Sequence, residues 1–155
     1  VSISASLHHV SNVQRILEEM KRVLKSGGHF ILAEMHREGL TEAELTSVYL
    51  HQWAADVDSA LGRLHNRTFS RQELLDFVEG MELDNIEIYD CVERDSEPLE
   101  TARIEQLEGL VERLIRRADG ASNYEELKVR GEELSKRLHE VGAQREPILI
   151  VVGEK

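Results

Sequence analysis

Residues 1–34, which read VSISASLHHVSNVQRILEEMKRVLKSGGHFILAE, decide the fold. Residues 1–6 alternate and are β-prone, which predicts a strand. A capping box at residues 11–14 then opens a helix with apolar residues at helical spacing. Gly27 and Gly28 end this helix, and the apolar run 30–33 predicts a buried strand. A strand, a helix and a strand with short connections predict a right-handed parallel crossover and therefore an α/β fold.

The rest of the sequence predicts four more helices and two more strands. We expect helices over residues 41–64 and 70–81, then two that form a charged hairpin, from Pro98 to the turn at Asp119 and over 123–141. The core-facing stripe of the first of these helices is expected to contain Leu50, Trp53, Val57, Leu61 and Leu64. Strands are expected over residues 83–92 and 148–152. The last strand is apolar on both faces, which places it inside a sheet rather than at its edge.

Composition limits the class of protein. The chain has 155 residues, 19 of them basic and 30 acidic, and its net charge is -11. This balance repels phosphates and argues against nucleic-acid binding. The longest apolar run, 148–152, is far too short to cross a bilayer. The single cysteine, Cys91, allows no internal disulfide, and no signal segment opens the chain. We therefore expect a cytoplasmic protein with no nucleic-acid or membrane partner.

Two motifs within residues 1–34 carry a family resemblance. They are Ser4-Ala5-Ser6-Leu7-His8-His9-Val10, which follows the first strand, and RVLKSGG at 22–28, which precedes the second strand. Together they resemble the class I S-adenosylmethionine-dependent methyltransferases, and more narrowly the branch that acts on small molecules. Members of the family often have Pro where this chain has Ser26.

The resemblance implies an α/β fold that is the C-terminal part of a Rossmann-like methyltransferase sheet. It would contain strands four to seven, with the last strand antiparallel, and an inserted helical hairpin. Residues 1–155 would form a partial methyltransferase domain. Strands four to six would lie within 1–92, the hairpin within 93–146 and the last strand within 147–155.

A cofactor motif of the family is missing from this sequence. The family holds S-adenosylmethionine on a glycine-rich loop after its first strand, but no G-x-G occurs here. The resemblance therefore implies a fragment of a longer enzyme, inactive by itself. The strand at residues 1–6 would then leave an apolar sheet edge open. We expect either that a second copy covers this edge or that the chain is disordered near residue 1.

The resemblance also assigns roles to the loop after the first strand. In the family this loop faces the methyl group, so Ser4, Ala5, Ser6 and Leu7 are expected to bind the cofactor. His8 and His9 are expected to be catalytic, because a histidine can take a proton from an acceptor hydroxyl, amine or acidic carbon. The alternative is that the two histidines cap the following helix and pack on the sheet.

A second group of polar residues lies on the predicted helix 41–64 and just beyond it. His51, Asp58 and His65 recur at intervals of seven residues, along one face of the helix. In the family this region helps to cover the acceptor pocket. We therefore expect His36, His51, Trp53, Asp58 and His65 to bind the substrate. A solvated polar face is one alternative. A zinc or iron site is another, since His and Asp can ligate these metals, but we assign no metal here because seven residues of straight helix span about 10 Å.

The functional prediction is S-adenosylmethionine-dependent methyl transfer to a small-molecule acceptor by the longer parent enzyme. The alternative is a non-catalytic, methyltransferase-like module that binds a protein partner. The open strand edge or the helical hairpin would make that contact, and either surface could instead join two copies of this chain. The sequence does not identify the acceptor, because pocket-lining loops vary freely on this kind of fold.

Overall fold

The computed structural model describes residues 1–92 and 97–155. The chain divides into two compact units. Unit 1 comprises Val1–Glu38, Thr68–Val92 and Pro147–Lys155, and unit 2 comprises Gly39–Arg67 and Glu93–Glu146. In this division the helical hairpin shares a unit with the segment that follows the second strand. The segment after the second strand joins the hairpin and supplies the apolar side chains on which it packs.

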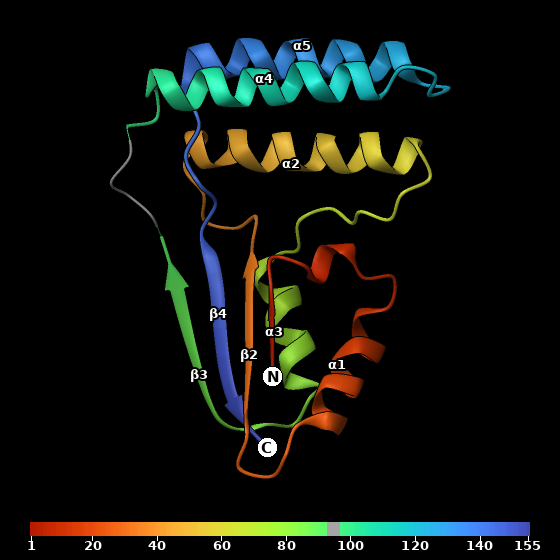
Figure 1. Cartoon of the computed structure of the whole chain (residues 1–155). Coiled ribbons are helices and arrows are strands. Elements are labelled where there is room, and N and C mark those ends of the chain that lie inside the picture. Colours follow the sequence, from red (N-terminus) through yellow and green to blue (C-terminus); the bar gives the residue numbers. More distant parts are fainter. Residues whose placement is uncertain (93–96) are drawn as a thin grey trace. The chain divides into compact units, whose positions relative to one another are not determined.

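Unit 1 is built on a four-stranded mixed sheet. Its strands are β1 (Ser2–Ser4), β2 (His29–Met35), β3 (Asp84–Cys91) and β4 (Ile148–Glu154), in the order β1-β2-β4-β3 (Figure 1). β1 and β2 are parallel, whereas β4 is antiparallel to both of its neighbours. The prediction of an α/β fold with an internal last strand is therefore confirmed.

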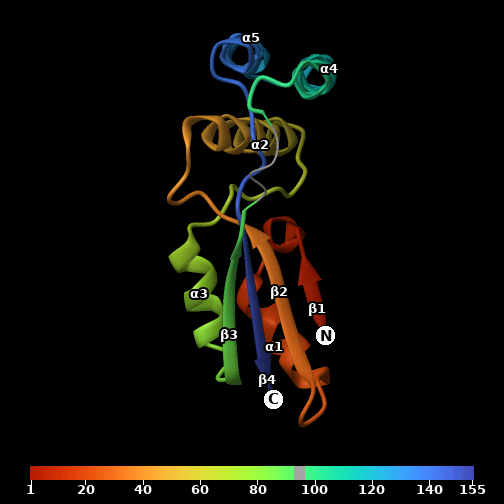
Figure 2. The same cartoon turned by 90° about the vertical axis from the view of Figure 1, so that its left-hand side faces the viewer.

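Two helices and a short 3-10 turn complete unit 1. The turn η1 (Leu7–His9) follows β1, α1 (Val13–Val23) connects β1 to β2, and α3 (Arg71–Glu79) precedes β3. Figure 2 shows α1 and α3 beside the sheet. Leu17 of α1 and Leu74 of α3 are fully buried in the same apolar cluster as the sheet. The cluster consists of Leu7, Leu17, Leu24, Phe30, Leu32, Leu74, Val78, Met81, Leu83, Leu149 and Val151.

The start of unit 1 differs from the prediction in two details. The N-cap of α1 is Asn12, whose side chain accepts a hydrogen bond from the backbone N–H of Arg15 at 3.0 Å. The predicted capping box that begins at Ser11 is therefore wrong by one residue. Residues 1–6 are all described, and only Ser2–Ser4 forms a strand, at one edge of the sheet.

The other face of the sheet is largely apolar and partly exposed. Ile31, Ile148 and Tyr89 point to this face and are 39%, 41% and 51% exposed. No helix of unit 1 packs on this face, since α1 and α3 both join the cluster on the opposite one. Every residue of β3 is exposed, including Cys91.

Unit 2 is a three-helix arrangement. It contains α2 (Glu42–Ala60), α4 (Thr101–Arg117) and α5 (Tyr124–Val141), and α4 and α5 run antiparallel beside each other (Figure 1). No helix in the described part of the chain is long and apolar enough to cross a membrane. The core of the unit consists of Leu50, Trp53, Val57, Ile104, Val111, Leu114, Ala118, Leu127, Leu138 and Ala143.

The ends of two helices in unit 2 were predicted incorrectly. α2 ends at Ala60 rather than near Leu64, because Gly62 takes a left-handed conformation with φ 75° and turns the chain away from the helix. Leu64 is consequently exposed and does not belong to the core stripe. α4 begins at Thr101, three residues after Pro98.

Candidate functional site

The loop that follows β1 lies at the carboxyl edge of the parallel strand pair. Because β1 and β2 are parallel, their carboxyl ends meet at the same edge of the sheet. Ala5 leaves β1 with φ 42°, a left-handed conformation that is costly for a residue other than glycine. The loop then enters η1. In α/β sheets, ligands bind outside the carboxyl ends of strands, so this edge is the first candidate for a site.

A buried carboxylate on β2 organises this loop. Glu34 is only 1% exposed, and its Oε2 accepts hydrogen bonds from the backbone N–H groups of Ser6 at 3.1 Å and Leu7 at 2.8 Å. Its Oε1 lies 3.0 Å from Nδ1 of His8, which is 4% exposed. One side chain of β2 therefore holds both the backbone of the turn and the first histidine in place.

The electrostatics of Glu34 favour its charged form. Burial raises the pKa of Glu34, but the hydrogen bond and the charge of His8, together with backbone N–H donors, outweigh burial and leave the pKa below its ordinary value. A carboxylate can only accept at Nδ1, so His8 carries a proton there. The lone pair of a neutral His8 is consequently on Nε2. This is the arrangement of a general base held by a carboxylate.

Sequence reasoning did not single out Glu34. Its signal is the position of a charged residue directly after the apolar run at 30–33, on a strand predicted to be buried. A buried acidic residue requires partners, and partners of this kind mark a candidate site. The periodicity of a strand alone does not show that the N–H groups of a distant loop supply those partners.

The predicted cofactor residues occupy three kinds of position. Ser4 and Ser6 are exposed, and the Ser6 hydroxyl donates to the carbonyl oxygen of Ser4 at 2.7 Å. Ala5 is exposed at the strained turn. Leu7 is fully buried in the core of unit 1. Its side chain therefore anchors the loop, and its contribution to any ligand would come from the backbone.

The two adjacent histidines are not equivalent. His8 is buried beside Glu34, whereas His9 is exposed. The centroids of the two rings are 4.2 Å apart, at an interplanar angle of 55°. The pairing with the carboxylate therefore favours His8 over His9 as the proton-accepting residue.

His36 lies directly after β2 and is buried. Its Nδ1 accepts a hydrogen bond from the backbone N–H of Glu38 at 3.3 Å. Among the described residues its Nε2 has no hydrogen-bond partner, and Oδ1 of Asp90 is 3.7 Å away. Burial lowers the pKa of His36, the nearby Asp90 charge partly opposes this, and Arg71 lowers it further. Arg71 in turn binds Asp90 through two 2.9 Å hydrogen bonds.

Unit 2 brings together three of the other predicted residues. His65 lies beyond the end of α2, and the chain returns so that its Nδ1 is 2.9 Å from Oδ2 of Asp58. Its Nε2 is 3.3 Å from Nε2 of His51. The sequence argued against a metal ion shared by His51, Asp58 and His65, because it assumed that one straight helix runs through His65. That assumption is wrong, because α2 ends at Ala60.

Trp53 does not join this group. It is fully buried in the core of unit 2, and its Nε1 donates to the carbonyl oxygen of Leu127 at 2.9 Å. The expectation that Trp53 lines a substrate pocket is therefore corrected. Its helical position is part of the apolar stripe, and that stripe faces α4 and α5.

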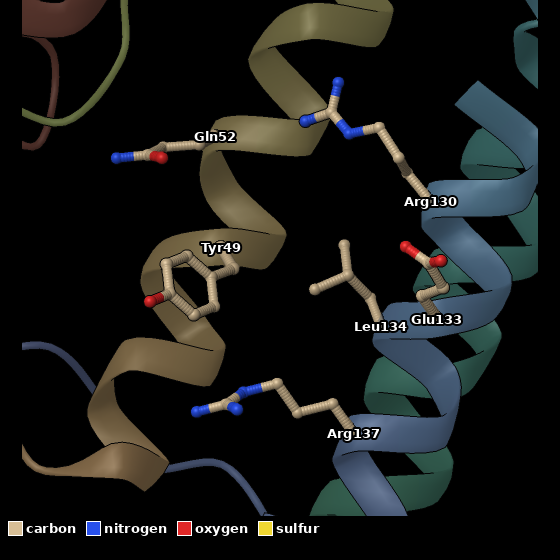
Figure 3. A pocket seen from close by; sticks show the side chains of 6 residues that line it. All are labelled: Tyr49, Gln52, Arg130, Glu133, Leu134 and Arg137. Atoms are coloured by element: carbon tan, nitrogen blue, oxygen red, sulfur yellow. The ribbon is translucent and has the colours of Figure 1, made fainter. Parts of the chain in front are cut away.

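A cavity of about 300 Å³ in unit 2 contains none of the predicted site residues. Leu134 reaches from α5 toward α2, between two arginines of α5, and the side chains that line the cavity are shown in Figure 3. Both arginines already have carboxylate partners: Arg130 binds Asp56 at 2.8 Å, and Arg137 binds Glu42 at 2.7 Å. The lining residues are Tyr49, Gln52, Arg130, Glu133, Leu134 and Arg137.

Comparison with known families identifies the start of the chain. Residues 1–32 match the family model of a methyltransferase domain. This match includes β1, the loop and most of β2, and it confirms the resemblance to the S-adenosylmethionine-dependent methyltransferases. No curated protein matches the sequence.

Solved structures share the fold over the whole chain. A cyclopropane-fatty-acyl-phospholipid synthase-like protein from Lactobacillus casei has a TM-score of 0.62 and 12% identity, and the match covers 100% of this chain and 55% of that one. A candidate methyltransferase from Bacillus halodurans has a TM-score of 0.54 and 15% identity, and the match covers 100% of this chain and 63% of that one. The YcgJ protein from Bacillus subtilis has a TM-score of 0.52 and 15% identity, and the match covers 99% of this chain and 63% of that one. The chain thus has a methyltransferase-like α/β fold and spans less than two thirds of each of these proteins.

Proposed function

We propose that the protein containing this chain transfers a methyl group from S-adenosylmethionine to a small-molecule acceptor. The observation that carries this proposal is the buried Glu34–His8 pair at the carboxyl edge of β1 and β2. His8 lies in the segment that matches the methyltransferase domain, residues 1–32, and Glu34 lies two residues beyond that segment. A carboxylate-held histidine at such an edge suits an acceptor that must lose a proton.

The chemistry required of this chain is limited to orientation and proton transfer. The sulfonium of the bound cofactor supplies an electrophilic methyl group. With the cofactor bound, Nε2 of His8 would take the proton of the acceptor hydroxyl, amine or acidic carbon. The acceptor's electron pair would form its bond to the methyl carbon as the bond from that carbon to the sulfonium sulfur breaks, and S-adenosylhomocysteine would be the leaving group. Glu34 stabilises the resulting imidazolium and keeps the ring oriented, because its own charged form is favoured in this environment.

The loop residues are proposed to hold the cofactor. Ser4, Ala5 and Ser6 are exposed at the sheet edge. The backbone N–H groups of Ala5 and Ser6 are held by β2, so a ligand would meet a loop whose shape is already fixed. Leu7 positions this backbone from the core, and His36, after β2, is proposed to contact the acceptor. Orientation of this kind contributes much of the rate enhancement in a transfer between two bound molecules.

A calorimetric titration of S-adenosylhomocysteine tests the proposal. The titrated proteins are the chain itself and the full-length product of the gene that encodes it. We expect the full-length protein to bind one equivalent. We also expect Glu34→Gln to weaken binding at least tenfold, because the turn loses its charged acceptor. His8→Asn should leave binding within about threefold and should lower the rate of methyl transfer about 10²–10⁴-fold, as expected for loss of a general base. Failure of the full-length protein to bind would overturn the proposal.

One observation favours a second candidate, a non-catalytic module that binds a protein partner. The face of the sheet opposite α1 and α3 exposes Ile31, Ile148 and Tyr89. Their cross-strand partners on this face include Val152, Met35 and Ile150. Exposed apolar patches of this kind mark interaction surfaces. The same titration separates the two candidates, because a binding module would take up no S-adenosylhomocysteine in any form of the protein.

A further inference from the structure

Two histidines of unit 2 approach each other because the chain reverses after α2. His51 lies within α2, and His65 lies five residues beyond the last residue of that helix. Leu61 caps the helix and Gly62, with φ 75°, turns the chain. The backbone N–H of Arg63 then donates to the carbonyl oxygen of Asp58 at 2.9 Å, so the segment folds back along the helix that it has just left.

Asp58 fixes the orientation of His65. Oδ1 of Asp58 accepts a 2.6 Å hydrogen bond from Nη2 of Arg117 on α4, and its Oδ2 is 2.9 Å from Nδ1 of His65. The side chains of Asp58 and His65 are largely buried, since they are 17% and 8% exposed, respectively. The carboxylate is held by the arginine and acts only as an acceptor, so the proton of a neutral His65 is on Nδ1 and its lone pair on Nε2 points to His51.

The separation of the two Nε2 atoms matches a metal site. It is 3.3 Å, and the rings stand at 77° to each other. In a tetrahedral zinc site with bonds of about 2.0–2.1 Å to histidine nitrogen, two such ligand atoms lie about 3.3 Å apart. A ligating histidine typically donates its other ring N–H to a carboxylate, as His65 does to Asp58.

We propose that unit 2 binds a divalent cation of the zinc class through Nε2 of His51 and Nε2 of His65. Asp58 is the positioning residue, because it orients His65 without contacting the metal. Binding requires His51 to take the tautomer with its proton on Nδ1, and no net proton is lost. Two nitrogen ligands leave coordination positions for water or other donors, as in open zinc sites.

Cobalt absorption tests the site, because Co²⁺ reports tetrahedral nitrogen coordination in the visible range and Zn²⁺ displaces it. The probe is Co²⁺ added to the whole chain without an affinity tag, followed by Zn²⁺. We expect one equivalent to bind. His51→Ala and His65→Ala should each weaken binding at least tenfold, and Asp58→Asn should weaken it about 10–100-fold, the usual effect of removing the carboxylate behind a ligand.

The matched control is His139→Ala, since His139 is also in unit 2 but lies on its surface beside Glu108. This variant should bind as tightly as the unchanged chain. Circular dichroism of each variant shows whether it has folded, and His51→Gln replaces His51→Ala if the latter has not. Binding that survives in the folded His51 and His65 variants would overturn the proposal, as would the absence of a tetrahedral spectrum. Neither result would bear on methyl transfer, which is proposed from unit 1.

Discussion

At the scale of single residues, Glu34 shows how a charge can be placed inside a core. The apolar strand around it would exclude an unpaired carboxylate, because burial of an unpartnered charge is very unfavourable. Two backbone N–H groups and the His8 ring together satisfy both oxygens. The turn after β1 therefore depends on Glu34 for its shape, and the buried carboxylate of Glu34 depends on the turn for its hydrogen-bond partners.

Glu34→Gln should lower the free energy of unfolding by about 2–3 kcal/mol near neutral pH, since a hydrogen bond to a buried charged group typically contributes about 1.5–3 kcal/mol. The native pKa of Glu34 is below its ordinary value of 4.5, so this stabilisation is present above that pH and is lost as the pH falls through the native pKa. Urea unfolding measures the effect. Glu18→Gln, an exposed change on α1, should leave stability nearly unchanged, and an equally small effect at Glu34 would contradict the assigned role.

His36 should make stability depend on pH in the same direction but at higher pH. Its pKa is lower in the folded chain than its ordinary value of 6.5, so the unfolded chain binds the proton more readily. The free energy of unfolding should therefore fall as the pH drops below about 6.5, and this contribution should level off below the folded pKa.

His36→Asn removes the titrating group and retains an acceptor for the backbone N–H of Glu38. Urea unfolding at about pH 7.5 and about pH 5.5 should show a smaller loss of stability in this variant than in the unchanged chain. His29→Asn, at an exposed position, should lose as much stability between these two pH values as the unchanged chain does. A His36→Asn variant with an undiminished loss would show that the buried imidazole does not control this dependence.

At the scale of elements, the packing of α2 against α5 depends on a glycine. A Cβ added at Gly131 of α5 would lie 2.6 Å from Cζ2 of Trp53 and 3.0 Å from Cδ1 of Ile115. The indole is fully buried and bonded through its Nε1, so it has little room to move. The glycine therefore serves a close approach between helices, at the expense of the intrinsic stability of α5.

Gly131→Ala should destabilise the chain by about 1–2 kcal/mol, because overpacking costs typically exceed the gain of about 1 kcal/mol in helix propensity. Gly109→Ala on α4 is the matched change, since the nearest atom to its new Cβ is Nη1 of the flexible Arg113 side chain at 3.4 Å. It should stabilise the chain by up to about 1 kcal/mol. Thermal or urea unfolding distinguishes the two, and a stabilising Gly131→Ala would refute the packing argument.

At the scale of the whole molecule, the exposed edge at β1 remains the predicted surface for self-association. Val1 O and Ala5 N bond to β2, at 2.9 Å each, so by alternation the N–H groups of Ser2 and Ser4 point away from the sheet. An edge of this kind can pair with a second strand.

Ser2→Pro should abolish such pairing, because proline lacks the outward N–H while the bonds to β2 stay in place. We expect the unchanged chain to sediment as a dimer and the Ser2→Pro variant as a monomer. Ser11→Ala, outside the strand, should sediment like the unchanged chain. A monomeric unchanged chain at micromolar concentration would refute self-association through this edge.

The sequence by itself determined the class of fold and most of the elements. Hydrophobic periodicity and turn residues placed the strands and helices, and apolar residues on both faces placed the last strand inside the sheet. Residues 1–34 were sufficient to identify the methyltransferase resemblance and to name His8 and His9 together as catalytic candidates. These signals are local, since each depends on residues within a few turns of helix or one strand.

Only the tertiary structure decided which polar groups meet. It placed Glu34 against the turn at Ser6 and His8, and it ended α2 early enough for His65 to return to His51. It also joined α2 to the helical hairpin as a unit of its own. The physical reason is that such contacts depend on chain reversals and on how buried polar groups find partners, and neither is encoded in the spacing of residues along one element.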